Sequence, residues 1–119
     1  MRPFPLASKL QFLVGNELEQ ICLGFWQFQF TFKSGHITVE GDLEHVDEAG
    51  AVRRHNTDAD RVSPLCIHHL LGQKVRSVSV EDFCLTLAFE RGDLLRIFSE
   101  EGPFECGQIY DDTGLMTVF

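Results

Sequence analysis

The feature that most limits the fold is an internal repeat: the sequence matches itself when it is shifted by 57 residues. The match runs without a gap from residue 13 to residue 35, and it consists mainly of a shared pattern of apolar residues and glycines. We infer a duplicated module; the alternative is two unrelated hairpins with similar patterns. The matched pairs include Leu13 with Leu70, Gly15 with Gly72, Trp26 with Phe83, Phe28 with Leu85, Phe30 with Leu87, Phe32 with Phe89 and Gly35 with Gly92.

Each copy contains a strand and a turn that indicate an antiparallel hairpin. Apolar and polar residues alternate over residues 26–32 and again over 83–89, which is typical of a half-buried strand. Gly35 and Gly92 follow these strands and allow the positive φ angles that many hairpin turns need. The returning strands are predicted over residues 36–40 and 93–98, with one extra residue, interpreted as a bulge, in the second copy.

Each hairpin is preceded by a short helix and by a strand with irregular spacing. Residues 6–14 and 64–71 are predicted as helices, the second starting at Ser63-Pro64 and ending at Gly72. The apolar residues of the next segment are spaced by three and then by two, which breaks simple alternation and predicts a bulged first strand in both copies. These residues are Leu18, Ile21 and Leu23 in the first copy and Val75, Val78 and Val80 in the second.

These patterns predict a mostly β protein of the α+β class. The expected architecture has two similar modules, each a short helix followed by a three-stranded antiparallel meander, packed around a pseudo-two-fold axis. Residues 1–119 are predicted to form a single domain, with module one at about 5–42, a connecting hairpin or loop at 43–62, and module two at about 63–119. The four rings of Trp26, Phe28, Phe30 and Phe32 are expected in the core, so Trp26→Ala should cost about 3–5 kcal/mol.

The charge is strongly negative and unevenly distributed. Ten Lys and Arg against eighteen Asp and Glu give a net charge of −8. Residues 1–39 hold three basic and two acidic groups, whereas residues 40–119 hold seven basic and sixteen acidic groups. This balance argues against binding to nucleic acid or to an anionic membrane. The acidic excess has two interpretations: it maintains solubility, or it attracts a basic protein partner.

Residues 66–69, Cys-Ile-His-His, place a thiol and two imidazoles within one helical turn. Cys66, His68 and His69 are therefore weak candidates for a metal or small-ligand site, although zinc needs a third and usually a fourth ligand that the spacing does not mark. His36, His45, His55 and Cys106 are the conceivable additional donors.

Known catalytic motifs are absent from the sequence, so we assign no catalytic residue, no cofactor and no metal. An enzyme with an unrecognised site stays open as an alternative. The four cysteines form no C-x-x-C pair, the first residues lack the apolar region of a signal peptide, and no apolar run reaches the ~20 residues of a spanning helix. These observations predict reduced thiols and a cytoplasmic protein.

The two glycine-led strand pairs and the late Phe104-Glu105 segment resemble a class of small bacterial proteins of uncharacterised function. Some acidic proteins of this size are similar to immunity partners of bacterial toxins, and that resemblance implies a non-catalytic domain that neutralises a basic partner. A homodimer stays open. The predicted partner-binding residues are the acids Asp42, Glu44, Asp47, Glu48, Glu100, Glu101, Asp111 and Asp112.

Overall fold

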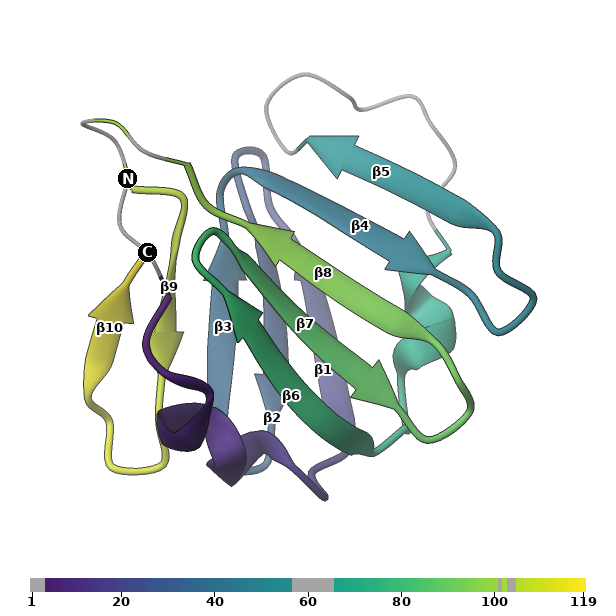
Figure 1. Ribbon diagram of the computed structural model, residues 1–119, viewed down its shortest axis with the longest axis horizontal. Helices are drawn as coiled ribbons and strands as arrows, with labels where there is room; N and C mark the ends of the chain where they lie inside the picture. The colour runs from purple at the N-terminus through teal and green to yellow at the C-terminus, as the bar shows by residue number, and fades with distance from the viewer. Residues whose placement is uncertain (1–3, 57–65, 101, 103–104) are drawn as a thin grey trace.

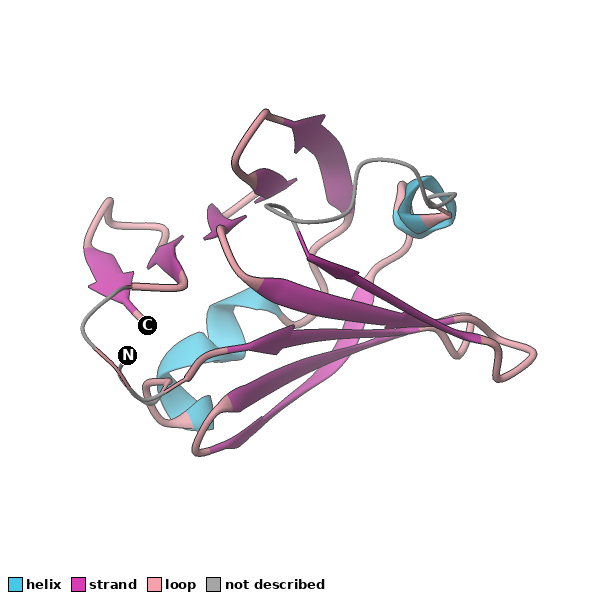
Figure 2. Cartoon of the chain, turned by 90° about the horizontal axis from the view of Figure 1, so that it is seen from above, coloured by secondary structure: helices cyan, strands magenta, loops and turns pink. Residues whose placement is uncertain are grey.

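Two five-stranded antiparallel sheets dominate the computed structural model, which describes residues 4–56, 66–100, 102 and 105–119 (Figure 1). The strands of the two sheets run in different directions, and the sheets form two layers with short helices at their margins (Figure 2). The first sheet has the order β1 (Leu18–Leu23), β2 (Phe28–Phe32), β3 (Gly35–Val39), β9 (Gly107–Tyr110) and β10 (Met116–Val118). The second has the order β6 (Val75–Glu81), β7 (Cys84–Phe89), β8 (Leu94–Phe98), β4 (Asp42–Val46) and β5 (Val52–Asn56).

The predicted mostly β character is therefore confirmed, and so are the two three-stranded meanders, β1–β2–β3 and β6–β7–β8. Both meanders begin with the bulge that the apolar spacing predicted. The pairing of β1 with β2 shifts between Leu18 and Gln20, and the pairing of β6 with β7 shifts between Val75 and Ser77. On either side of the bulges, Leu18 and Ile21 in β1 and Val75, Val78 and Val80 in β6 contribute to the core, whereas Leu23 at the end of β1 is exposed.

The predicted helices are present as short 3₁₀ segments, η1 (Ala7–Leu13) and η2 (Ile67–Leu70). The second is shorter than expected, and residues 64 and 65 of the predicted helix lie outside the described part of the chain. Both helices contribute buried leucines to the core. Neither of these segments, and no other helix in the described residues, is long and apolar enough to span a bilayer.

The last hairpin of each half of the chain pairs with the meander of the other half. After β3, the chain crosses to the second sheet, where the β4–β5 hairpin pairs with β8; after β8, it returns to the first sheet, where β9–β10 pairs with β3. The sequence predicted a hairpin in the connecting segment, and β4–β5 confirms it up to Asn56, but this exchange between sheets was not predicted. Residues 57–62 of that segment lie outside the described residues.

Main-chain hydrogen bonds join the two sheets where η1 and η2 lead into β1 and β6. Gly15 N–H donates to the Val75 carbonyl at 2.8 Å, and Gly72 N–H donates to the Leu18 carbonyl at 2.9 Å. Adding 57 to the donor's residue number and subtracting 57 from the acceptor's residue number converts the first bond into the second. The same relation holds for the bonds from Leu18 N–H to Gln73 O and from Val75 N–H to Asn16 O, both 3.0 Å, and residues 17 and 74 form a bridge with each other.

Trp26 is not in the core, contrary to the prediction, because β2 begins only at Phe28. Gly24 N–H donates to the Gln27 carbonyl at 2.7 Å and closes a turn that leaves the Trp26 side chain 58% exposed. Phe83, its counterpart in the repeat, is also exposed. The other members of both stripes are buried as predicted, namely Phe28, Phe30 and Phe32 in β2 and Leu85, Leu87 and Phe89 in β7.

Gly35 and Gly92 serve different purposes, although both were expected to provide positive φ angles. Gly92 has a φ of 99° in a three-residue turn, which takes up the extra residue of the second copy. Gly35 does not have positive φ; a Cβ atom there would collide with the Tyr110 carbonyl oxygen and press on the Phe12 ring. Gly35 is needed because β9 and η1 approach closely.

Candidate functional site

Three of the eight acids predicted to bind a partner are already paired with arginines inside the protein. Glu44 on β4 lies directly opposite Arg96 on β8 in the strand register, so the two side chains meet on the outer face of the sheet. Exposed pairs of this kind contribute little to stability, but they reduce the charge available to a partner. The three pairs are Asp42–Arg54 at 3.0 Å, Glu44–Arg96 at 3.0 Å and Asp47–Arg53 at 3.2 Å.

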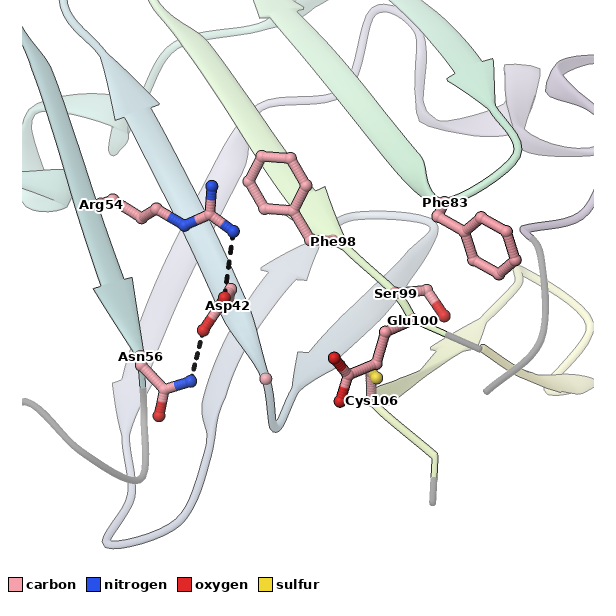
Figure 3. Close-up of a pocket in the computed structure, with 9 residues that line it drawn as sticks. Asp42, Arg54, Asn56, Phe83, Phe98, Ser99, Glu100 and Cys106 are labelled. Atoms are coloured by element: carbon pink, nitrogen blue, oxygen red, sulfur yellow. Dashed lines mark hydrogen bonds and ion pairs between the residues drawn. The ribbon is translucent and has the colours of Figure 1, made fainter. Parts of the chain in front are cut away.

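Asp42 and Glu100, from the two predicted acidic segments, come together at a cavity of about 290 Å³ (Figure 3). The cavity lies between the start of β4, the ends of β5 and β8, and Cys106. Asn56 also donates a hydrogen bond to Asp42, and the Arg54 guanidinium lies 4.3 Å from the centre of the Phe98 ring. Asp42 is thus held by two neighbours, and Glu100 is the exposed acid of this cavity.

The remaining predicted acids do not join this cavity. Glu48 lies in the β4–β5 turn, Asp111 and Asp112 lie in the β9–β10 turn, and Figure 1 shows these turns on opposite sides of the molecule. Glu101 lies outside the described residues. The eight acids therefore do not form one continuous surface.

Asp47 and Asp111 organise their turns in the same way. The Asp47 carboxylate accepts hydrogen bonds from Ala49 N–H and Ala51 N–H, at 3.0 and 2.9 Å. The backbone hydrogen bond from Ala51 is the main reason that the pKa of Asp47 lies below its ordinary value. In the other turn, the hydroxyl of Thr113 donates to Asp111 at 2.6 Å and is the main reason that the pKa of Asp111 is lowered. Both carboxylates therefore have a structural role.

The Cys-His-His segment lies on and just before η2. Cys66 is half-buried, while His68 and His69 are exposed with their ring centres 4.4 Å apart. In the described part of the chain, no three His, Cys, Asp or Glu side chains are grouped so that they could hold a metal ion.

The end of β1 and the β1–β2 turn carry exposed apolar residues that sequence reasoning missed. Leu23, Phe25 and Trp26, here called the aromatic tip, are 61%, 65% and 58% exposed. The Phe25 and Trp26 rings contact edge to face with centroids 4.7 Å apart. The alternation that continues from Phe28 back to Trp26 concealed this cluster, although Gly24 was available as a signal of the turn.

Acidic side chains lie at the same end of the first sheet as the aromatic tip. Phe28 pairs with Val39, so the tip that precedes Phe28 and Glu40, which follows Val39, lie at the same end of the sheet. The Gln108 amide donates to both Glu40 and Glu105, at 2.7 and 2.8 Å, and thereby brings these two carboxylates together. We call Glu40 and Glu105, with Asp42 and Glu100 of the nearby cavity, the acidic rim.

A second group that sequence reasoning missed is a buried polar network at the other end of β4. His45 Nε2 lies 2.8 Å from an Asp93 carboxylate oxygen, and the Gln73 amide donates to the other oxygen at 3.2 Å. His45, Asp93 and Gln73 are each at least 95% buried. Asp93 and Gln73 line a cavity of about 310 Å³, here called the Asp93 cavity, together with Asp47, Glu48, Ala49, His69 and Arg91.

In comparisons with known proteins, no family model, no curated protein and no solved structure matches this chain.

Proposed function

We propose that this protein is a non-catalytic binding domain that docks a basic partner protein through the aromatic tip and the acidic rim. The observation that carries the proposal is the exposure of Leu23, Phe25 and Trp26 at the end of β1 and on the turn that follows it. Exposed apolar clusters bordered by polar groups are typical of protein interfaces, where Trp and other aromatic residues often dominate the binding energy.

Charge identifies the kind of partner that suits this surface. The acidic rim lies at the same end of the first sheet as the tip, and the whole chain carries a net charge of −8. A partner with Lys and Arg around an apolar groove would complement both features and would associate faster at low salt. A basic toxin belongs to this class of partner, in line with the resemblance to immunity proteins.

We also propose that the two halves of the chain are duplicated copies related by an approximate two-fold axis. Support comes from the paired hydrogen bonds at the junction of the sheets, from the bulge at the start of each meander, and from the matching Asp47 and Asp111 turns. The bridge between residues 17 and 74 joins two positions that the 57-residue shift makes equivalent, as expected where such an axis crosses the chain.

The test uses the intact protein as bait for proteins from its source cells, at low and at high salt, beside the double variant Phe25→Ser/Trp26→Ser. We expect a captured protein of basic isoelectric point that is released by salt and not retained by the double variant. Trp26 is the sole tryptophan, so its fluorescence should change when the purified partner is added.

The matched control is Leu115→Ser, because Leu115 is equally exposed but lies on the distant β9–β10 turn. Equal capture by the wild type and the tip variant would refute the proposal, as would a captured partner that is acidic. A concentration-dependent dimer that is abolished by the tip variant would assign the tip to a second copy of this chain and would also refute it.

A further inference from the structure

Residues around the Asp93 cavity have counterparts at matching positions in the other half of the chain. His45 on β4 lies opposite Leu95 on β8, and Ile109 on β9 lies opposite Ile37 on β3 in the same way. Asp93 closes the β7–β8 turn, as Gly35 closes the β2–β3 turn.

A side-chain amide makes the same pair of hydrogen bonds in both halves, which supports the match between these positions. Gln73 donates to the carbonyl of His69 at 2.9 Å and accepts from the Arg91 N–H at 3.4 Å. Asn16 likewise donates to the carbonyl of Phe12 at 2.7 Å and accepts from the Ser34 N–H at 3.1 Å.

The space itself is filled differently. In the first half, the Phe12 ring packs against Gly35, and the strand position that matches His45 holds the apolar Ile109. In the second half, the exposed His69 takes the position of Phe12, and His45 on β4 is hydrogen-bonded to Asp93. A buried ionisable pair is costly compared with apolar packing, and Ile109 shows that an apolar residue fits the matching strand position.

Hydrogen bonds hold the Asp93 carboxylate in place. Nε2 of His45 faces one carboxylate oxygen and therefore donates to it, whereas Nδ1 of His45 has no hydrogen-bond partner within the described residues. The Gln73 amide donates to the other oxygen. Asp93 is only 4% exposed and forms no ion pair with a Lys or Arg in the described part of the chain.

The rest of the cavity lining also favours a cation. Asp47, Glu48 and Asp93 contribute three carboxylates, against one guanidinium from Arg91. Asp47 is already paired with Arg53, which leaves Glu48 and Asp93 to meet a ligand. A volume of about 310 Å³ is at the lower end of the range for small-ligand pockets, which suits an alkylammonium or alkylguanidinium group.

We propose that the Asp93 cavity binds a cationic amine or guanidinium group, with Asp93 and Glu48 as its anionic partners. The group could belong to a free small molecule or to a Lys or Arg side chain of a protein. The proposal rests on the cavity and the His45–Asp93 pair, and it holds whether or not the aromatic tip binds a protein.

The test is a titration of the intact, isotope-labelled protein with butylguanidine, followed by the amide NMR shifts of Gln73 and Gly92. Butylurea, which has a similar shape but no charge, is the matched probe. We expect saturable shifts with butylguanidine only, and at least about tenfold weaker binding for Asp93→Asn. Asp112→Asn, at the position in the β9–β10 turn that matches Glu48, should bind as the wild type does.

His69→Phe provides a second variant in case Asp93→Asn fails to fold. It introduces the ring that fills the matching space in the first half, so it should keep the fold and abolish binding. Equal shifts with butylurea, no saturable shift, or wild-type affinity in both cavity variants would overturn the proposal.

A peptide with a single arginine separates the two sources of the cation. Peptide binding at least as tight as that of butylguanidine, and lost in His69→Phe, would assign the site to protein side chains; binding of butylguanidine alone would assign it to free small molecules. Repeating the butylguanidine titration on Phe25→Ser/Trp26→Ser should give an unchanged affinity, so that failure at this cavity and failure at the tip can be told apart.

Discussion

Phe30 and Trp26 are four residues apart, yet only Phe30 lies between the two sheets. Phe30 is fully buried and pairs with Ile21 and Ile37 on the neighbouring strands, whereas Trp26 projects from the β1–β2 turn. Removing a large buried ring costs stability through lost burial and through the cavity that remains. The same truncation on an exposed turn removes few such contacts.

We therefore expect Phe30→Ala to lower the free energy of unfolding by about 3–5 kcal/mol, and Trp26→Ala to lower it by less than about 1 kcal/mol. Chemical denaturation of the two variants beside the wild type measures both values. A loss for Trp26→Ala as large as that for Phe30→Ala would contradict the exposed position of the tip.

Gly107 is a residue whose lack of a side chain matters for packing. A Cβ atom at this position would collide with the Thr38 carbonyl oxygen and with the Phe119 ring. Gly107→Ala should therefore destabilise the protein by about 1–3 kcal/mol or more through overpacking. Gly41→Ala is the control, since its Cβ would lie at an ordinary 3.5 Å from Cys106. Thermal unfolding of both variants tests the difference, and equal melting temperatures would be the contrary result.

At the residue level, the sequence predicted the core well where alternation coincides with a strand. Phe28, Phe30 and Phe32 are buried as expected, but the same alternation extends to Trp26, where the chain has already turned. The His45–Asp93 pair could not be predicted, because its members are 48 residues apart and meet only since β4 pairs with β8. Periodicity reports local geometry and does not reveal which distant strands become neighbours.

The turn that closes the β9–β10 hairpin depends on a charged side chain. Asp111 accepts hydrogen bonds from the N–H groups of Thr113 and Leu115, at 2.9 and 3.0 Å, and from the Thr113 hydroxyl. These bonds favour the charged carboxylate and so lower its pKa in the folded protein. Because the folded-state pKa is depressed, the carboxylate stabilises the fold above its unfolded pKa, and this contribution is lost as the pH falls through the folded-state value.

We expect Asp111→Asn to flatten the dependence of stability on pH below about pH 4, near the ordinary aspartate pKa. The asparagine can still accept the same hydrogen bonds, so the change isolates the effect of charge. Denaturation midpoints between about pH 2 and pH 6 measure it. Asp112→Asn is the control because it removes a neighbouring carboxylate that accepts none of these hydrogen bonds, and the two variants should differ in slope. Identical slopes would show that Asp111 does not contribute in this way.

At the level of elements, the two bulges show how far the spacing of apolar residues can predict structure. A shift of one residue reverses which face of a strand a side chain occupies, so spacings of three and then two require an extra residue in the pairing. Both bulges are present at the expected places. The helices were less well predicted, since short helical segments are stabilised by packing rather than by their own sequence.

For the molecule as a whole, the most important feature is that the halves of the chain exchange hairpins. The exposed edge of β3 is covered by β9, and that of β8 is covered by β4. Separated fragments 1–56 and 57–119 would each lack a strand partner for one meander and would expose the inner face of a sheet.

We therefore expect neither fragment to unfold cooperatively alone, and an equimolar mixture to regain native circular dichroism as a one-to-one complex. A mixture of either fragment with itself is the control. If fragment 1–56 alone gave a dispersed NMR spectrum as a monomer, the exchange would not be needed for folding.

The same exchange determines how the native protein opens. Inter-strand hydrogen bonds tie the two halves of the chain together in both layers, β3 with β9 in one and β4 with β8 in the other, so one half cannot detach while the other stays intact. Deuterium should consequently enter the central amides of both layers at a common slow rate, as expected when whole-chain unfolding is the only route by which solvent reaches them.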